Sequence, residues 1–146
     1  MPLARSTLSL VKTGVRPREF ELREDGRALG SLRLGPGRAP AEATVGHRSW
    51  TLTPGACRSS VDALAADGGV GAALRAGHIT LAGDRRPFAT WRRNRTVGAC
   101  AELAADGSTA TLRIRRRTAP GLDVSIDGDL LERELLVLLA GYDLLR

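Results

Sequence analysis

The sequence predicts an all-β fold with one helix: a closed, mostly antiparallel barrel of about twelve strands, with a buried hydrophobic C-terminal helix through its centre. Three observations predict this fold. Sequence elements recur at an interval of about 40 residues, Asp-Gly pairs separate runs of alternating polarity, and one segment near the C-terminus is apolar on all sides.

The recurring elements centre on Asp-Gly pairs. Asp25-Gly26, Asp67-Gly68 and Asp106-Gly107 are separated by 42 and 39 residues, and the letters LAADG occur around the second and the third. Trp50 and Trp91 are also 41 residues apart. These intervals predict three strand repeats, over about 5–40, 41–82 and 83–126.

Each Asp-Gly pair predicts a hairpin, because type I′ turns need positive φ at both central residues, which Asp tolerates and Gly accepts. Thr109–Arg115 alternates after the third pair, which is typical of a sheet with one buried face. Further Gly and Pro turns divide each repeat into about four strands. Ser60–Ala66 is Ala-rich and could form a helix, but its place in the repeat favours a strand.

The chain ends differently. Leu135–Ala140 is apolar without a break, and Leu130, Leu131, Tyr142, Leu144 and Leu145 extend this set. The pattern predicts a buried helix over about 128–146. Asp127 or Asp129 would cap it, and Glu132 and Glu134 would lie in its first turn. Gly141 weakens a helix by up to about 1 kcal/mol, so we expect close packing against a neighbour there. Twelve strands enclose a lumen too wide for strand side chains alone, and this helix would fill it.

Length and charge suit a single domain spanning 1–146, and the net charge of +6 is unevenly distributed. Residues 75–117 hold ten arginines against three carboxylates, a net +7, whereas residues 118–146 carry −4 and residues 1–74 carry +3. With 21 arginines and one lysine, part of this excess reflects composition. The basic band predicts a phosphate-bearing, anionic-membrane or acidic-protein partner.

Three hairpin-rich repeats followed by one hydrophobic helix resemble the tubby C-terminal-like superfamily, whose branches include tubby proteins, phospholipid scramblases and LURP-one-related proteins. The segments that carry the resemblance are FELREDGRALGSLRL, SWTLTPG, LAADGGVGAALRAG, LAADGSTATLRIRRR and LLERELLVLLAGYDLL, and it covers about residues 5–146. The resemblance implies a short member with a twelve-stranded barrel, a helix threaded through its centre, and binding of anionic lipid headgroups outside the barrel. No binding residue of the family can be matched one for one.

The candidate ligand-binding residues are arginines of the basic band. Alternation places Arg113, Arg115 and Arg117 on one face of a strand, and the other five lie in or beside a strand that includes Trp91. If the strands near residues 85–117 are neighbours, the eight side chains form one patch; otherwise they are a solvated sheet face. They are Arg85, Arg86, Arg92, Arg93, Arg95, Arg113, Arg115 and Arg117.

Other chemistry finds little support. Cys57 and Cys100 lie too far apart for a zinc motif, and His47 and His78 occupy turns without a partner. The glycines at 68–71 lack the third glycine of a nucleotide-binding loop, because Leu74 occupies its position. The carboxylates at Glu19, Glu21, Glu24 and Asp25 alternate with Arg16, Arg18, Arg23 and Arg27, which favours cross-strand ion pairs over acid–base chemistry. The sequence therefore predicts no catalytic residues, no metal site and no cofactor.

These patterns predict a non-enzymatic binding module that recognises anionic lipid headgroups or an acidic partner through exterior arginines. The alternative is a protein-interaction or scaffold barrel without a lipid role, and a third hypothesis is a small-molecule site inside the barrel. Scarce aromatic residues and the absence of a recognition helix argue against nucleic acid. No segment has the roughly 20 apolar residues of a transmembrane helix. We therefore expect a cytoplasmic protein, peripheral to the membrane where it binds lipid.

Overall fold

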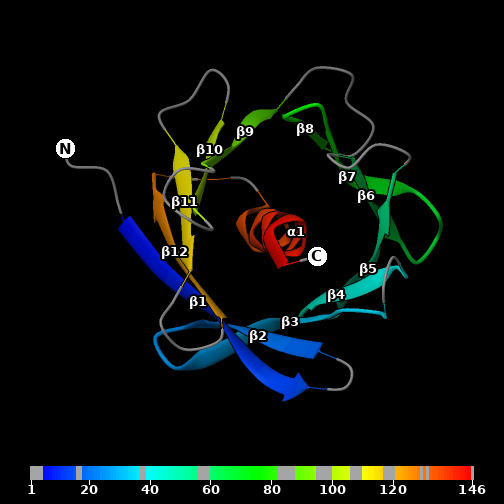
Figure 1. The fold of residues 1–146 in the computed structure, drawn as a ribbon, viewed down its shortest axis with the longest axis horizontal. Coiled ribbons are helices and arrows are strands. Elements are labelled where there is room, and N and C mark those ends of the chain that lie inside the picture. The colour runs from blue at the N-terminus through cyan, green and yellow to red at the C-terminus, as the bar shows by residue number, and fades with distance from the viewer. Residues whose placement is uncertain are drawn as a thin grey trace.

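The computed structural model is a closed barrel of twelve antiparallel strands with one C-terminal helix, which confirms the predicted fold class (Figure 1). It describes residues 5–15, 18–36, 39–55, 60–81, 88–94, 100–105, 110–116, 121–128, 130 and 132–145. The elements are β1 (Arg5–Val15), β2 (Arg18–Glu24), β3 (Arg27–Arg33), β4 (Ala41–Val45), β5 (Arg48–Pro54), β6 (Val61–Ala65), β7 (Val70–Arg75), β8 (His78–Leu81), β9 (Ala89–Asn94), β10 (Cys100–Ala105), β11 (Thr111–Arg116), β12 (Gly121–Asp127) and α1 (Arg133–Leu145).

Every strand pairs with its neighbours in sequence, and β1 closes the ring by pairing with β12. The closing ladder runs from Arg5 opposite Asp127 to Val11 opposite Gly121. Closure leaves no exposed sheet edge, which is how such folds avoid pairing with other chains. Because adjacent strands are antiparallel, odd-numbered strands all end at one mouth of the barrel and even-numbered strands at the other.

The strands alternate between a buried inner face and a solvated outer face, as their sequences predict. In β11, Leu112 and Ile114 are fully buried, whereas Arg113 and Arg115 between and after them are exposed. The Ala-rich segment that could have been a helix is strand β6, so the interpretation from its place in the repeat is confirmed.

The Asp-Gly turns differ from one another. Asp25 and Gly26 have φ of 52° and 78°, so the first turn has the predicted positive φ at both central residues. At the second, only Gly68 is left-handed (φ 87°), and Asp67 accepts a 2.8 Å hydrogen bond from the Gly69 backbone N–H. That turn is therefore not type I′, although it joins β6 and β7 in the predicted hairpin. Asp106-Gly107 lies outside the described residues.

Helix α1 begins later than predicted, at Arg133. Gly128 and Glu132 have φ of 86° and 56°, so neither of these two residues is in a right-handed helical conformation. The first helical hydrogen bond runs from the Leu136 N–H to the Glu132 carbonyl (3.0 Å). Asp127 does not cap the helix; it ends β12 and binds Arg5. Asp129, the other predicted cap, lies outside the described residues, and Glu134 alone is acidic in the first turn.

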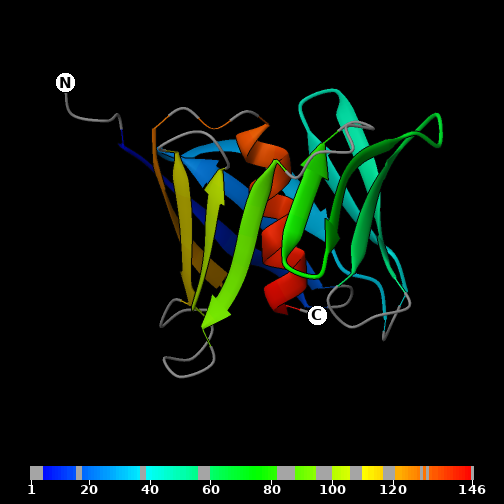
Figure 2. The ribbon, with the colours of Figure 1, turned by 90° about the horizontal axis from the view of Figure 1, so that it is seen from above.

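Figure 1 shows α1 inside the ring of strands, and Figure 2 shows it running along the barrel between the two mouths. Leu135–Leu144 is buried without a break. The helix contacts widely separated strands: Gly141 packs against Leu10 of β1 and Leu122 of β12, while Asp143 binds Trp91 of β9. Because α1 and the inner faces of the strands form one apolar cluster, the exposed groups available for binding lie on the outer wall and the two rims.

Candidate functional site

The structure describes the side chains of three of the eight predicted site arginines: Arg92, Arg113 and Arg115. All three are exposed. Arg93 is described only through its backbone, which pairs with Ala101. The remaining four candidates lie outside the described residues: Arg85, Arg86, Arg95 and Arg117.

The barrel register brings the three exposed arginines together. Arg92 of β9 and Arg113 of β11 both face Glu102 of β10 in the ladder, so they occupy one row across three strands. Two strand spacings separate them by about 10 Å, and Arg115 follows Arg113 by about 7 Å along β11. We call Arg92, Arg113 and Arg115 the wall cluster. The strands that carry these residues, β9 and β11, flank β10 in the barrel.

Several exposed arginines elsewhere on the barrel are engaged by carboxylates. Arg5 binds Asp127 at 2.8 Å, Arg33 binds Glu19 at 2.7 Å and Arg75 binds Asp62 at 3.0 Å. The hydrogen bond to Glu19 also raises the pKa of Arg33. These pairs are solvent-exposed and contribute little to stability, but they neutralise the charges they join.

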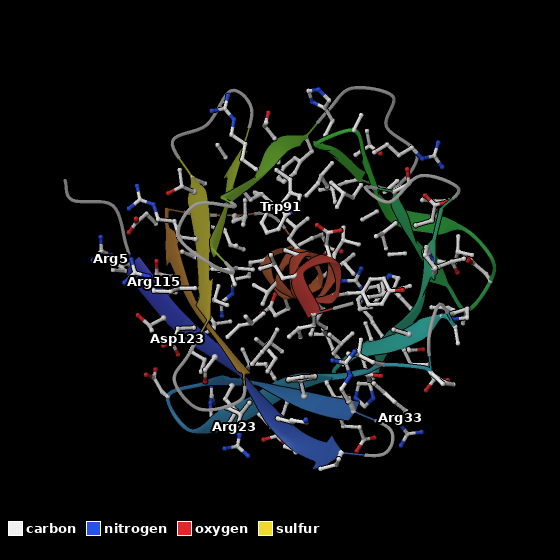
Figure 3. The ribbon with its side chains drawn as sticks, in the orientation of Figure 1. Arg5, Arg23, Arg33, Trp91, Arg115 and Asp123 are labelled. Carbon is white, nitrogen blue, oxygen red and sulfur yellow. The ribbon has the colours of Figure 1, made fainter. Side chains whose placement is uncertain are left out.

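The wall cluster differs from these arginines. None of its three guanidinium groups forms a hydrogen bond or an ion pair with another described residue. The nearest described carboxylate in the ladder is Asp123 of β12, in register with Arg115 (Figure 3). Glu102, in the row between Arg92 and Arg113, is described only through its backbone. The cluster therefore presents guanidinium N–H donors that described side chains leave unused, the arrangement that suits a phosphate or carboxylate ligand.

The acidic residues at the start of the chain form ion pairs, as predicted, but mostly with other partners. Glu19 binds Arg33 across strands, and Glu24 accepts two hydrogen bonds from Arg133 of α1, at 2.9 and 3.1 Å. Glu21 binds Arg23 along the same strand at 2.5 Å. Three of the four predicted carboxylates are therefore engaged in ion pairs with arginines.

One buried polar contact lies inside the barrel. The Trp91 Nε1 donates a 2.9 Å hydrogen bond to Asp143 Oδ2, and both residues are at most 5% exposed. Trp91 was predicted only as part of the repeat, and the single acidic residue in the last turn of an apolar helix was the signal for this contact. A carboxylate bonded to an indole inside the apolar core joins the helix to the wall of the barrel.

Metal sites and membrane-spanning helices were also considered for the described residues. No three His, Cys, Asp or Glu side chains among them gather closely enough to hold a metal ion. No helix in the described part of the chain is long and apolar enough to cross a membrane.

The fold and the wall cluster thus define a closed antiparallel β-barrel with an exposed basic surface. No family model matches the chain, and neither the curated proteins nor the solved structures contain a match. The resemblance to the tubby C-terminal-like superfamily stays a prediction, carried by the architecture and the quoted segments.

Proposed function

We propose that the protein is a non-enzymatic binding module whose wall cluster holds phosphate groups of anionic lipids at a membrane surface. The observation that carries the proposal is the contrast between Arg92, Arg113 and Arg115, which have no acidic partner among the described residues, and the paired arginines of β1, β3 and β7. Guanidinium groups grip phosphate oxygens through two parallel hydrogen bonds, and three within about 12 Å can hold neighbouring headgroups.

The remaining features are compatible with a binding role. Helix α1 and the inner faces of the strands form one buried apolar cluster, which favours binding on the outside over the interior site of the third hypothesis. Strands β9 and β10 pair over six residues, and β10 and β11 pair over five. These ladders hold the backbone of this part of the outer wall in place. A rigid basic surface binds without an ordering cost for the backbone.

Vesicle sedimentation tests the proposal. The protein should sediment with vesicles of phosphatidylcholine and phosphatidylserine and stay in solution with phosphatidylcholine alone. Each arginine near an anionic surface contributes about 1 kcal/mol, so Arg113→Gln/Arg115→Gln should weaken binding roughly 20- to 30-fold. The matched control is Arg5→Gln/Arg27→Gln, which removes the same charge from exposed positions away from the wall cluster.

The outcomes separate the hypotheses. Equal binding to anionic and neutral vesicles would contradict the recognition of anionic lipid and would favour the scaffold alternative. Binding to anionic vesicles that both double variants weaken equally shows that net charge, rather than the wall cluster, is responsible. A cytoplasmic location with peripheral membrane association is part of the same proposal, and charge reversal at Arg113 and Arg115 should release the protein from membranes in cells.

A further inference from the structure

The two mouths of the barrel carry different charge. One mouth lies where β1, β9 and β11 end and where β2, β10 and β12 begin, and α1 has its last turn there. The pairing of Val11 with Gly121 and of Val15 with Arg18 fixes this arrangement. Figure 2 shows the chain's C-terminal end at this mouth. We call it the basic rim, and the other mouth, at the first turn of α1, the acidic rim.

Most described cations at the acidic rim are held by carboxylates; Arg27, exposed at the start of β3, bonds to no described carboxylate. Arg48 binds both carboxylate oxygens of Glu132, at 2.8 and 2.6 Å, and Arg133 likewise binds Glu24. Arg5 binds Asp127 at the same mouth. Exposed Asp25 and Asp67 add negative charge at hairpin turns there.

Cations at the basic rim are less compensated. Arg33 and Arg75 are paired, and exposed Glu42 lies opposite Arg33 in the ladder, but Lys12, Arg18 and Arg115 bond to no described carboxylate. Arg18 donates instead to the Leu145 carbonyl in the last turn of α1 (3.2 Å), so its charge remains.

The amino-acid sequence of the connections repeats this contrast. Segments that join strand ends at the basic rim contain five arginines and no Asp or Glu, although the placement of these residues lies outside the described part of the chain: Arg16, Arg38, Arg58, Arg95 and Arg117. Segments that join elements at the acidic rim contain six acidic residues and two arginines: Asp25, Asp67, Asp84, Asp106, Asp129 and Glu132, with Arg85 and Arg86. By sequence, the connections at the basic rim are therefore net positive and those at the acidic rim net negative.

The basic rim also exposes an apolar side chain. Val15 at the end of β1 is 71% exposed, the most exposed large hydrophobic residue described, and it lies opposite Arg18 in the ladder. Val70, 42% exposed at the start of β7, lies at the acidic rim. An apolar residue beside cations suits the headgroup region of an anionic bilayer, where charge attracts and the methyl groups bury.

We infer that the protein docks end-on: the basic rim faces an anionic lipid bilayer, Val15 enters the headgroup region, and the acidic rim points away. This inference rests on the proposed binding of anionic lipid and adds the orientation: the molecule tilts onto the basic rim on the side of β9–β11, so that Val15 and the wall cluster, which reaches this rim at Arg115, both meet the bilayer. An anionic surface favours this orientation, because the basic rim lowers its energy and the acidic rim raises it. A flat side-on pose would instead place Arg113, in the middle of β11, nearest the membrane and keep Val15 in water.

Tryptophan substitution at two matched valines tests the orientation. The native Trp50 and Trp91 are buried and supply a constant background. Val15→Trp should shift its emission to the blue on phosphatidylserine-containing vesicles, and lipids brominated near the headgroup should quench it. Val70→Trp, the same substitution at the acidic rim, should show neither effect.

The inference is overturned by a binding protein in which Val15→Trp shows no blue shift, or in which both tryptophans respond alike. A protein that binds neither kind of vesicle defeats the proposed function instead. Lys12→Gln/Val15→Ser gives a second readout without a fluorophore: binding should fall roughly tenfold or more from the lost cation and apolar contact, whereas Arg113→Gln should have the smaller effect. The reverse order indicates side-on docking, and circular dichroism confirms that each variant is folded.

Discussion

The indole N–H of Trp91 in β9 donates a 2.9 Å hydrogen bond to Asp143 Oδ2 in the last turn of α1, within the apolar interior of the barrel. The contact joins the wall to the C-terminal end of the helix. At the other end, Arg48 and Arg133 reach Glu132 and Glu24, so α1 is fixed to the strands by polar contacts at both ends and by apolar packing between them.

Removing the acceptor should destabilise the barrel. Asp143→Leu leaves the buried Trp91 N–H without that partner, and we expect a loss of about 1–3 kcal/mol in the free energy of unfolding. Asp143→Asn keeps an oxygen acceptor at the same position and should lose less. Urea unfolding followed by far-ultraviolet circular dichroism measures both, and equal losses would show that the hydrogen bond to Trp91 is not the stabilising contact.

The acidic-rim ion pairs should make stability depend on pH. Hydrogen bonds from Arg133 and Arg48 hold the pKa of Glu24 and Glu132 below their ordinary value of 4.5, against the opposing effect of burial. A lowered folded pKa stabilises the protein above the unfolded pKa, and that contribution is lost as pH falls through the folded value. The two pairs should therefore contribute fully at pH 7 and progressively less below about pH 4.5.

The test is Glu24→Gln/Glu132→Gln, compared with the parent protein across pH. The variant should be less stable by about 1–2 kcal/mol at pH 7, and the difference should shrink toward zero in strong acid. Glu42→Gln is the control, because Glu42 is exposed and forms no hydrogen bond with another described residue. A difference that stays constant with pH would contradict the assignment of these pairs.

Much of this architecture could be predicted because local signals agree with the fold. Alternation in Thr111–Arg116 fixed which side of the wall its arginines occupy, and the apolar run at Leu135–Leu139 predicted a buried helix. The helix start was missed because Leu130 and Glu132 have helix-compatible sequence, whereas Glu132 has a left-handed φ and is paired with Arg48, 84 residues away.

The candidate site was predictable only in part, for a similar reason. Sequence spacing identified the arginine-rich strands, but whether a guanidinium is neutralised depends on ladder register and on partners from distant segments. Arg133 shows this, since its carboxylate partner is 109 residues away. The basic rim was missed because its members come from strand ends spread across the chain, and only the antiparallel order of the closed barrel gathers them at one mouth.

Gly141 was expected to mark close packing, and the structure confirms it. A Cβ at this position would lie 2.6 Å from Leu10 Cδ1, which is fully buried. Gly141→Ala should therefore destabilise the protein, since overpacking costs about 1–3 kcal/mol and the helix-propensity gain is at most about 1 kcal/mol. In a Leu10→Ala background the same substitution should become neutral or stabilising. Denaturation midpoints of the four proteins measure this coupling, and additive effects would contradict the contact.

Vesicle binding should weaken as the salt concentration rises, because its origin is electrostatic. The Debye length falls from about 10 Å at 0.1 M salt to about 3 Å at 1 M, so the attraction between a bilayer and Lys12, Arg92 or Arg115 is screened over this range. Binding to phosphatidylserine-containing vesicles should weaken steeply as sodium chloride rises, and Arg92→Gln/Arg115→Gln should reduce the slope as well as the affinity. Arg5→Gln/Arg27→Gln should leave the slope unchanged. Binding that persists at 1 M salt would mean that apolar contacts, with Val15 the most exposed of the described hydrophobic residues, dominate the interaction instead.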